Sequence, residues 1–159
     1  MFQYLPKNKH IVRWIMNIWP PFLFSGIGVT ELSDDFRYCK VRLKNWAATR
    51  NVNGAQYGGS LFAMTDPIYA MMLILLLGDK YYIWDKEAEI EFKKPGIGKI
   101  FLECSITDKM LQEIYEHTRN GDKYFPKITS NLYDETGDTI ATTTRTLYVR
   151  LKPKYRPSD

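Results

Sequence analysis

Residues 51–67 read NVNGAQYGGSLFAMTDP, and this stretch decides how the rest of the chain is interpreted. A polar loop with glycines runs directly into an apolar helix, and one carboxylate, Asp66, falls inside that helix. Burying a charge costs several kcal/mol unless the charge is paired or solvated. A carboxylate at this position is therefore either an unusual structural choice or a catalytic one.

The apolar helix should begin at Gly58 or Gly59 and end at Gly78. It is long enough to raise the question of a membrane span. A central Asp66 followed by Pro67 would make such a span costly, and no other segment resembles it. We therefore expect a helix enclosed by protein, kinked just after Asp66, and no transmembrane span.

Alternating apolar and polar residues predict strands on both sides of this helix. The expected strands are 27–33 and 36–45 before it, and 81–93, 99–108, 124–134 and 139–151 after it. Turn signals at 95–98 and 135–138 join consecutive strands as hairpins, which predicts a mostly antiparallel sheet. A helix this apolar should be wrapped by a curved sheet, so the fold class is α+β.

The ends of the chain carry weaker patterns. An amphipathic helix is expected at about 8–18, and the Pro-Pro pair at 20–21 should end it. Residues 109–119 form a short helix or an irregular segment, and the tail from about 153 should be frayed. The whole of 1–159 is expected to be one domain.

Composition narrows the classes of partner. The net charge is +4, but the basic residues are scattered, which argues against a nucleic-acid-binding surface. Cys39 and Cys104 fall on strand patterns as buried small residues, which suits a reducing compartment, and no secretory signal is evident, so we expect a cytoplasmic protein. His10 and His117 have no ligand neighbours at metal-binding spacing, so neither a metal nor a cofactor is expected.

The strand order and the central helix together resemble the hot-dog fold, in which a curved antiparallel sheet wraps one helix. Residues 51–67 are similar to the corresponding segment of the PaaI-like acyl-CoA thioesterases, whose pattern runs Asn, His-Gly-Gly, six apolar or small residues and Asp. Asn51, Gly58, Gly59 and Asp66 stand at that spacing, whereas Tyr57 occupies the position of the histidine.

Three segments resemble a bacterial branch of this superfamily, the DUF4442 group: residues 58–67, 84–86 and 148–150. The resemblance implies hydrolysis of an acyl-CoA or similar thioester at a site that two subunits share. It also implies a homodimer or a dimer of dimers.

The helix start and the carboxylate supply the chemistry that such a reaction needs. Free N–H groups at Gly58 and Gly59 would stabilise an oxyanion, although the two glycines could equally serve a tight turn and close packing. Asp66 would act as general base or as nucleophile, and its structural alternative is a pair with a Lys or a Tyr. Gly58 lies eight residues before Asp66, about 12 Å along a helix, so one carbonyl contacts both only if they come from different chains.

The remaining candidates lie near this segment. Asn51 would position water or tie down its own loop, and Tyr57 can donate a hydrogen bond but is a poor base at neutral pH. Substrate-binding candidates are Gln56, Thr65, Lys93 and Lys94. The two lysines would attract coenzyme A phosphates or lie on a solvated turn, and Thr65 would bond a helix carbonyl.

Three other interpretations remain. The first is a non-catalytic acyl- or lipid-binding protein that has lost efficient chemistry with the histidine. The second is peripheral membrane attachment through the 8–18 helix. A hot-dog dehydratase is disfavoured because such enzymes pair a histidine with a carboxylate.

Asp85 and Lys86 are interpreted as a local ion pair that contributes little to stability.

Overall fold

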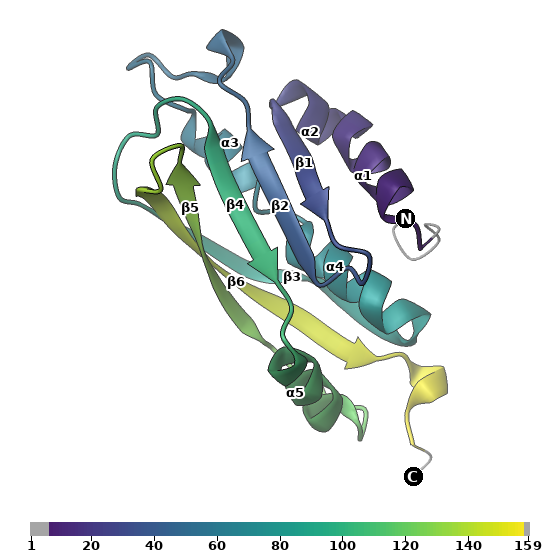
Figure 1. The fold of residues 1–159 in the computed structure, drawn as a ribbon. Coiled ribbons are helices and arrows are strands. Elements are labelled where there is room, and N and C mark those ends of the chain that lie inside the picture. Colours follow the sequence, from purple (N-terminus) through teal and green to yellow (C-terminus); the bar gives the residue numbers. More distant parts are fainter. Residues whose placement is uncertain (1–6, 158–159) are drawn as a thin grey trace.

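The computed structural model describes residues 7–157 of the chain, and these residues build one six-stranded antiparallel sheet around a central helical segment (Figure 1). The elements in chain order are α1 (Lys9–Ile18), α2 (Pro20–Phe24), β1 (Ile27–Leu32), β2 (Tyr38–Leu43), α3 (Gly58–Ala63), α4 (Ile68–Leu77), β3 (Tyr81–Phe92), β4 (Ile100–Ser105), α5 (Asp108–Thr118), β5 (Lys127–Asp134) and β6 (Thr139–Leu151). Short 3-10 turns lie at Ala47–Thr49, Gly78–Lys80 and Pro153–Tyr155. The α+β class and all six strands match the sequence-based expectation.

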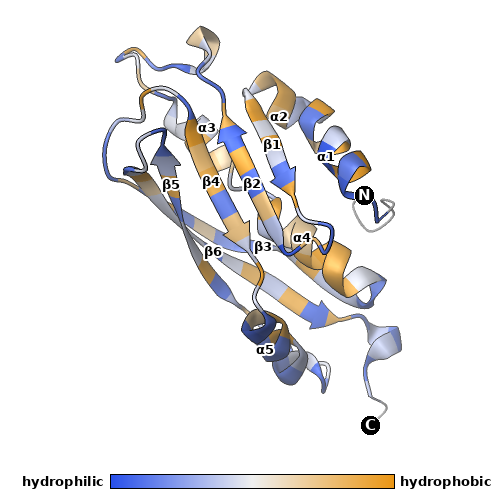
Figure 2. Ribbon diagram, viewed as in Figure 1, coloured by the Kyte–Doolittle hydropathy of each residue, from blue (hydrophilic) through white to orange (hydrophobic). Residues whose placement is uncertain are grey.

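The sheet has the strand order β1-β2-β4-β5-β6-β3, with every neighbouring pair antiparallel. It curves so that α3 and α4 lie on one face, and apolar residues gather between helix and sheet (Figure 2). Almost every residue of α4 is buried in this core. Most of the apolar stretch 58–80 is therefore covered by protein, which explains a composition that would also suit a membrane span.

The central helix is broken rather than merely kinked. The first part, α3, ends at Ala63, and α4 begins at Ile68, with a cis peptide bond between Asp66 and Pro67 in the connecting segment. Proline has no N–H to continue the helical ladder, and the Asp66 N–H turns back to the Ala63 carbonyl at 3.1 Å. Asp66 thus lies outside both helices, in the only irregular part of residues 58–77.

The β1 edge of the sheet is covered by α1. This helix begins at Asn8, whose side chain accepts hydrogen bonds from two N–H groups of the first turn. Farther along, the Asn17 side chain both donates to the Val29 carbonyl (3.1 Å) and accepts from the Val29 N–H (2.7 Å), and Arg13 donates to the Thr30 carbonyl. These side chains take the place of a neighbouring strand.

The opposite edge is open. It is formed by β3, which has 12 residues and pairs only with β6 among the residues described. An uncovered edge of this length presents a row of unpaired N–H and C=O groups that another strand can bind. The backbone groups at the β1 edge are therefore bonded by side chains of α1, whereas those at the β3 edge are free to pair with another strand.

One expectation about the chain ends needs correction. The prolines at 20–21 end α1 but also open α2, because proline is well accepted in the first turn of a helix. In the tail, Pro153–Tyr155 form a 3-10 turn in which Tyr155 and Lys154 both contact the Asp79 carboxylate, and residues 158–159 lie outside the described part of the chain. The segment at 109–119, left open by the sequence, is helical.

The two cysteines are buried, as expected, and they lie on neighbouring strands. Cys39 of β2 and Cys104 of β4 are direct partners in the sheet register, and both are free thiols with no exposed surface. Burial raises the pKa of Cys39 to about 12, so this thiol stays protonated at neutral pH.

The Asn17 contacts can be tested by the exchange Asn17→Ala. It leaves the Val29 N–H and C=O without partners, and we expect the free energy of unfolding in urea to fall by about 1–2 kcal/mol. His10→Ala is the matched control, because it is an exposed site on the same helix that gains similar helix propensity. A loss no greater for Asn17→Ala than for His10→Ala would show that this edge contact is not stabilising.

Candidate active site

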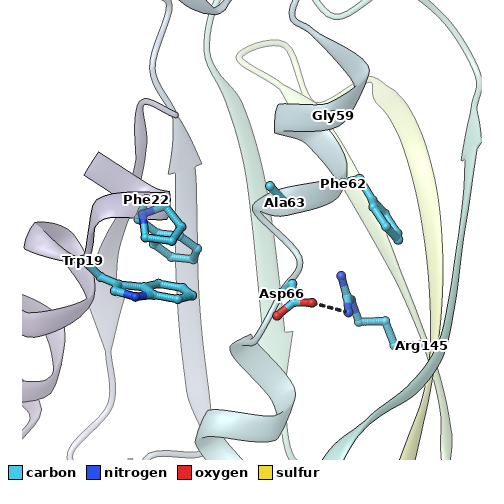
Figure 3. Close-up of a pocket in the computed structure, with 8 residues that line it drawn as sticks. Trp19, Phe22, Gly59, Phe62, Ala63, Asp66 and Arg145 are labelled. Carbon is cyan, nitrogen blue, oxygen red and sulfur yellow. Dashed lines mark hydrogen bonds and ion pairs between the residues drawn. The ribbon is translucent and has the colours of Figure 1, made fainter. Parts of the chain in front are cut away.

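The Asp66 carboxylate pairs with Arg145, which comes from β6 and lies 79 residues away in sequence (Figure 3). The distance from Arg145 Nη1 to Asp66 Oδ2 is 3.2 Å. The two side chains differ sharply in exposure, at 3% for Arg145 and 52% for Asp66. The buried Arg145 side chain therefore holds Asp66 in an ion pair, while much of the Asp66 carboxylate remains accessible to solvent.

Thr65 and Phe62 hold the guanidinium from the helix side. Thr65 Oγ1 accepts hydrogen bonds from Arg145 Nε (2.9 Å) and Nη2 (2.8 Å), and it donates to the Phe62 carbonyl. The Phe62 ring lies 5.2 Å from the guanidinium carbon, a cation–π distance. The expected bond from Thr65 to a helix carbonyl is confirmed, but Thr65 is 2% exposed and serves Arg145 rather than an open pocket.

A second carboxylate, Asp85 of β3, contacts the same nitrogen. Its Oδ1 atom lies 3.2 Å from Arg145 Nη1, so a single cation faces two acids. The interpretation of Asp85 and Lys86 as a local pair is wrong, because Lys86 pairs with Glu87 instead. Burial raises the pKa of Asp85 above its ordinary value, the Arg145 charge opposes that rise, and the charge of Asp66 adds to it.

Asp66 opens into a cavity of about 240 Å³ that we call the Asp66 hollow. One wall is formed by Gly59, Ala63 and Asp66, and the facing wall comes from the junction of α1 and α2 (Figure 3). The lining residues are Trp19, Pro21, Phe22, Gly59, Phe62, Ala63, Asp66 and Arg145. Apart from Asp66 and Arg145 at its base, the hollow is apolar, which suits a hydrocarbon group.

The amide groups of Gly58 and Gly59 have no acceptor among the residues described, as expected for the first positions of a helix. Both glycines also have close neighbours. A side chain at Gly59 would clash with the Tyr57 ring, and one at Gly58 would place its Cβ 3.0 Å from the Phe92 ring. The structure thus supports both interpretations of the glycines at once, free donors and close packing.

Tyr57 is the residue immediately before α3, and its side chain is largely exposed. Its hydroxyl has no hydrogen-bond partner within the described chain, and its ring stands beside Gly59. A donor is therefore available at the position where the resemblance would place a histidine.

A second cavity, about 460 Å³, lies beyond the helix start, and we call it the loop groove. It is lined by Asn51, Asn53, Ala55, Gln56, Gly58, Leu61, Phe92, Lys93, Lys94, Pro95 and Gly96. Lys93 pairs with Glu91 at 2.6 Å, and Lys94 pairs with Asp138 at 2.6 Å, so any bound phosphate would compete with these acids.

Asn51 and Gln56 give the groove its shape. Asn51 Oδ1 accepts hydrogen bonds from the N–H groups of Asn53 and Ala55, so the side chain ties down its own loop. Gln56 is 4% exposed, and its amide donates to the carbonyls of Lys44 and Gly98. The polar atoms of Gln56 are engaged in structure, which leaves it no evident contact with a ligand.

The predicted residues therefore divide between two cavities. Asp66 and Gly59 line the Asp66 hollow, whereas Asn51, Gln56, Gly58, Lys93 and Lys94 line the loop groove. Residues 7–157 contain no cluster of three or more potential metal ligands.

Arg145 was not among the site residues predicted from sequence, and Asp85 was interpreted only as half of a local ion pair, although each carries a signal. Arg145, Leu147 and Val149 are spaced two residues apart on one strand, so their side chains lie on the same face of the sheet. The two apolar residues mark that face as the inward one. Asp85 likewise follows Tyr81 and Ile83 at spacing two. A charge that alternation places inside needs a partner, and the two residues supply one to each other.

A protein-family model described as "Domain of unknown function (DUF4442)" matches residues 8–149. A search of curated proteins gave no match.

Three solved structures are similar over nearly their whole length. A Pseudomonas aeruginosa protein of unknown function, described as a probable thioesterase, is 21% identical with a TM-score of 0.79, covering 94% of this chain and 99% of its own. A putative thioesterase from Shewanella oneidensis is 18% identical (TM-score 0.67; 92% and 98% covered). A thioesterase from Haemophilus influenzae is 14% identical (TM-score 0.69; 95% and 96% covered). These likenesses establish the hot-dog fold of this chain.

The raised pKa of Asp85 makes a prediction about stability and pH. The folded protein binds the Asp85 proton more tightly than the unfolded chain does, so this group's stabilising contribution is full below its ordinary pKa and is lost as pH rises through the raised value. The unfolding free energy of the wild type minus that of Asp85→Asn should therefore fall as pH rises from about 3 to about 7.

Urea unfolding at several pH values measures this difference, and Glu87→Gln is the control. Lys86 lowers the pKa of Glu87, so the contribution of Glu87 is present above its ordinary pKa and is lost as pH falls. The unfolding free energy of the wild type minus that of Glu87→Gln should therefore rise as pH rises. This change should be smaller than the one for Asp85→Asn, because Glu87 is exposed. Parallel trends in the two variants would contradict the assignment.

Proposed function

The chain belongs to the DUF4442 family, and from that premise we propose that it hydrolyses an acyl-CoA or a similar acyl thioester at a site shared between two subunits. The observation that carries the proposal is the half-exposed Asp66 carboxylate, held by a buried arginine at the base of an apolar hollow. The hot-dog fold and the thioesterase descriptions of its structural neighbours support the reaction class.

Asp66 acts on the thioester in one of two ways. As a general base it takes a proton from water while the water oxygen attacks the carbonyl carbon; the C–S bond then breaks, and the thiolate leaves with a proton. As a nucleophile it forms an acyl anhydride and expels the thiolate, and water then hydrolyses the anhydride. Both routes give a carboxylic acid and a thiol, and both place negative charge on the carbonyl oxygen. The free amides at the start of α3 are the donors for that oxygen.

The two cavities suit the two ends of such a substrate. The acyl group lies in the Asp66 hollow against Trp19 and Phe22, whose rings offer apolar contact area. The thiol carrier lies in the loop groove, where Lys93 and Lys94 attract the phosphates of coenzyme A. Asn51 and Gln56 act there by fixing the loop, and Tyr57 donates a hydrogen bond near the helix start.

The open edge of β3 supports assembly into a homodimer or a dimer of dimers. Pairing of β3 with the same strand of a second copy would bring the two central helices alongside each other, because α4 packs against β3. The helix start of one chain would then approach Asp66 of the other. The free thiols Cys39 and Cys104 support a reducing compartment, and we place the protein in the cytoplasm.

The role of Asp66 is tested with a panel of acyl-CoA substrates of increasing chain length, following thiol release. Asp66→Asn should lower kcat by about 10²–10⁴-fold, because the amide neither accepts the proton nor attacks the carbonyl. Asp122→Asn, an exposed site with no partner in the described structure, is the control with the same charge change and should retain wild-type kcat.

Binding separates hydrolysis from the alternative of a non-catalytic acyl-binding protein. Calorimetric titration with the same acyl-CoA panel should show that Asp66→Asn still binds. Binding without turnover by the wild type would reject hydrolysis in favour of the binder, and equal turnover by Asp66→Asn and the wild type would remove Asp66 from the chemistry.

The Gly58 amide can be removed without disturbing the helix. Proline is accepted at the first helical position, and the preceding Tyr57 already has the extended conformation that proline requires (φ −64°, ψ 128°). Gly58→Pro should lower kcat by about 10²–10³-fold if this amide binds the oxyanion. Gly58→Ala adds a similar side-chain contact with Phe92 but keeps the N–H, so only the difference between the two variants reports the donor.

Mixing these variants tests whether two subunits share the site. Dimers assembled at random from Asp66→Asn and Gly58→Pro chains include half that are mixed, each with one intact site, so about a quarter of wild-type activity should return. No recovery, with mixed dimers demonstrated by tagged chains, would place both groups in the same subunit.

A further inference from the structure

Asp85 is a partly buried acid that has no role in the proposed hydrolysis. Its side chain is 19% exposed, and its Oδ1 atom has the ion pair with Arg145 but no hydrogen bond within the described structure. Asp66 and Asp85 also line one groove of about 340 Å³ between α4 and β3. The two carboxylates therefore share both a cation and a cavity.

Arg145 cannot serve both acids fully. The same nitrogen, Nη1, lies 3.2 Å from a carboxylate oxygen of each, while the other guanidinium nitrogens are engaged by Thr65. With Arg145 alone as partner, the Asp66 carboxylate would be held in a strong ion pair, and its lone pairs would be less available to a proton or to a carbonyl carbon. A second negative charge on the same guanidinium weakens that hold.

We propose that Asp85 is a positioning residue for Asp66: it takes a share of the single Arg145 charge and thereby leaves the Asp66 carboxylate freer to accept a proton or to attack a carbonyl carbon. Asp85 acts through Arg145 and does not touch the substrate. The catalytic consequence rests on the proposed function, whereas the effect on the Asp66 charge does not.

Among residues 7–157, the ion pairs of Arg145 of β6 are those with Asp66, from the segment between α3 and α4, and with Asp85 of β3. Cys104 of β4 also interacts with the Arg145 charge, but burial raises the pKa of its thiol, which stays neutral. The charge of Asp66 raises the pKa of Asp85, so the two carboxylates are electrostatically coupled.

The experiment follows the Asp66 side-chain carboxyl carbon by ¹³C NMR against pH in the wild type, Asp85→Asn, Asp85→Glu and Glu87→Gln. In the wild type the Asp66 carbon should record two steps, its own ionisation and the later ionisation of Asp85, whose pKa is raised. Asp85→Asn should remove the second step, and Asp85→Glu, which restores the charge, should bring it back. Glu87→Gln makes the same charge change on the exposed face of the strand and should leave both steps in place.

Hydrolysis of the acyl-CoA that the wild type cleaves fastest gives the second readout. In Asp85→Asn the plateau value of kcat should fall about tenfold, because Asp66 is then held by the whole of the Arg145 charge, while KM changes by less than about twofold. Asp85→Glu should restore kcat, whereas a purely structural role of Asp85 would not be rescued by the longer acid.

An Asp66 curve that still shows both steps in folded Asp85→Asn overturns the proposal. If that variant does not fold, the wild type alone decides. Coupled carboxylates titrate in two steps that both carbons record, whereas a single-step Asp66 curve rejects the coupling. Absence of turnover in the wild type would remove the proposed function and leave the NMR result to decide this inference.

Discussion

The structure around the candidate site depends on one buried cation. An arginine side chain keeps its charge at any pH at which proteins fold, so a guanidinium with 3% exposure must find its compensation inside the protein. Arg145 finds it in Thr65, Asp66 and Asp85, which come from the helical segment and from the neighbouring strand. Desolvation thus explains why these three side chains converge on one point of β6.

The helix break is what allows this convergence. In an uninterrupted helix Thr65 and Asp66 would be adjacent residues pointing in different directions. Between Ala63 and Ile68 the backbone leaves the helix, and both side chains reach the same guanidinium. Pro67 lies where the chain passes from the turn that carries Thr65 and Asp66 to the buried helix α4. The candidate site is formed at this junction.

Sequence alone predicted the scaffold better than the site. Period-two alternation located all six strands, and residues 51–67 placed the glycines at the start of a helix under the sheet, whereas Asp66 lies in the break after that helix. The contacts of Asp66 were not predictable in the same way, because Arg145 lies 79 residues away and only strand order brings it near. Composition also suggested the wrong partner for Asp85, since Lys86 is adjacent in sequence but points to Glu87. The register of β3 shifts between Asp85 and Glu87, and this irregularity leaves Lys86 beside Glu87 while Asp85 faces Arg145.

The unequal edges of the sheet have a consequence for assembly. Because Asn17 and Arg13 satisfy the backbone of β1, each chain offers one strand, β3, for joining its sheet to another. A chain with one open sheet edge can pair with only one other chain through that edge, and the resulting dimer has no open edge left. A chain with two open edges could add copies without limit, as fibres do. Arg13 and Asn17 of the N-terminal helix thus leave one edge of the sheet available for pairing. Assembly through that edge therefore stops at two chains.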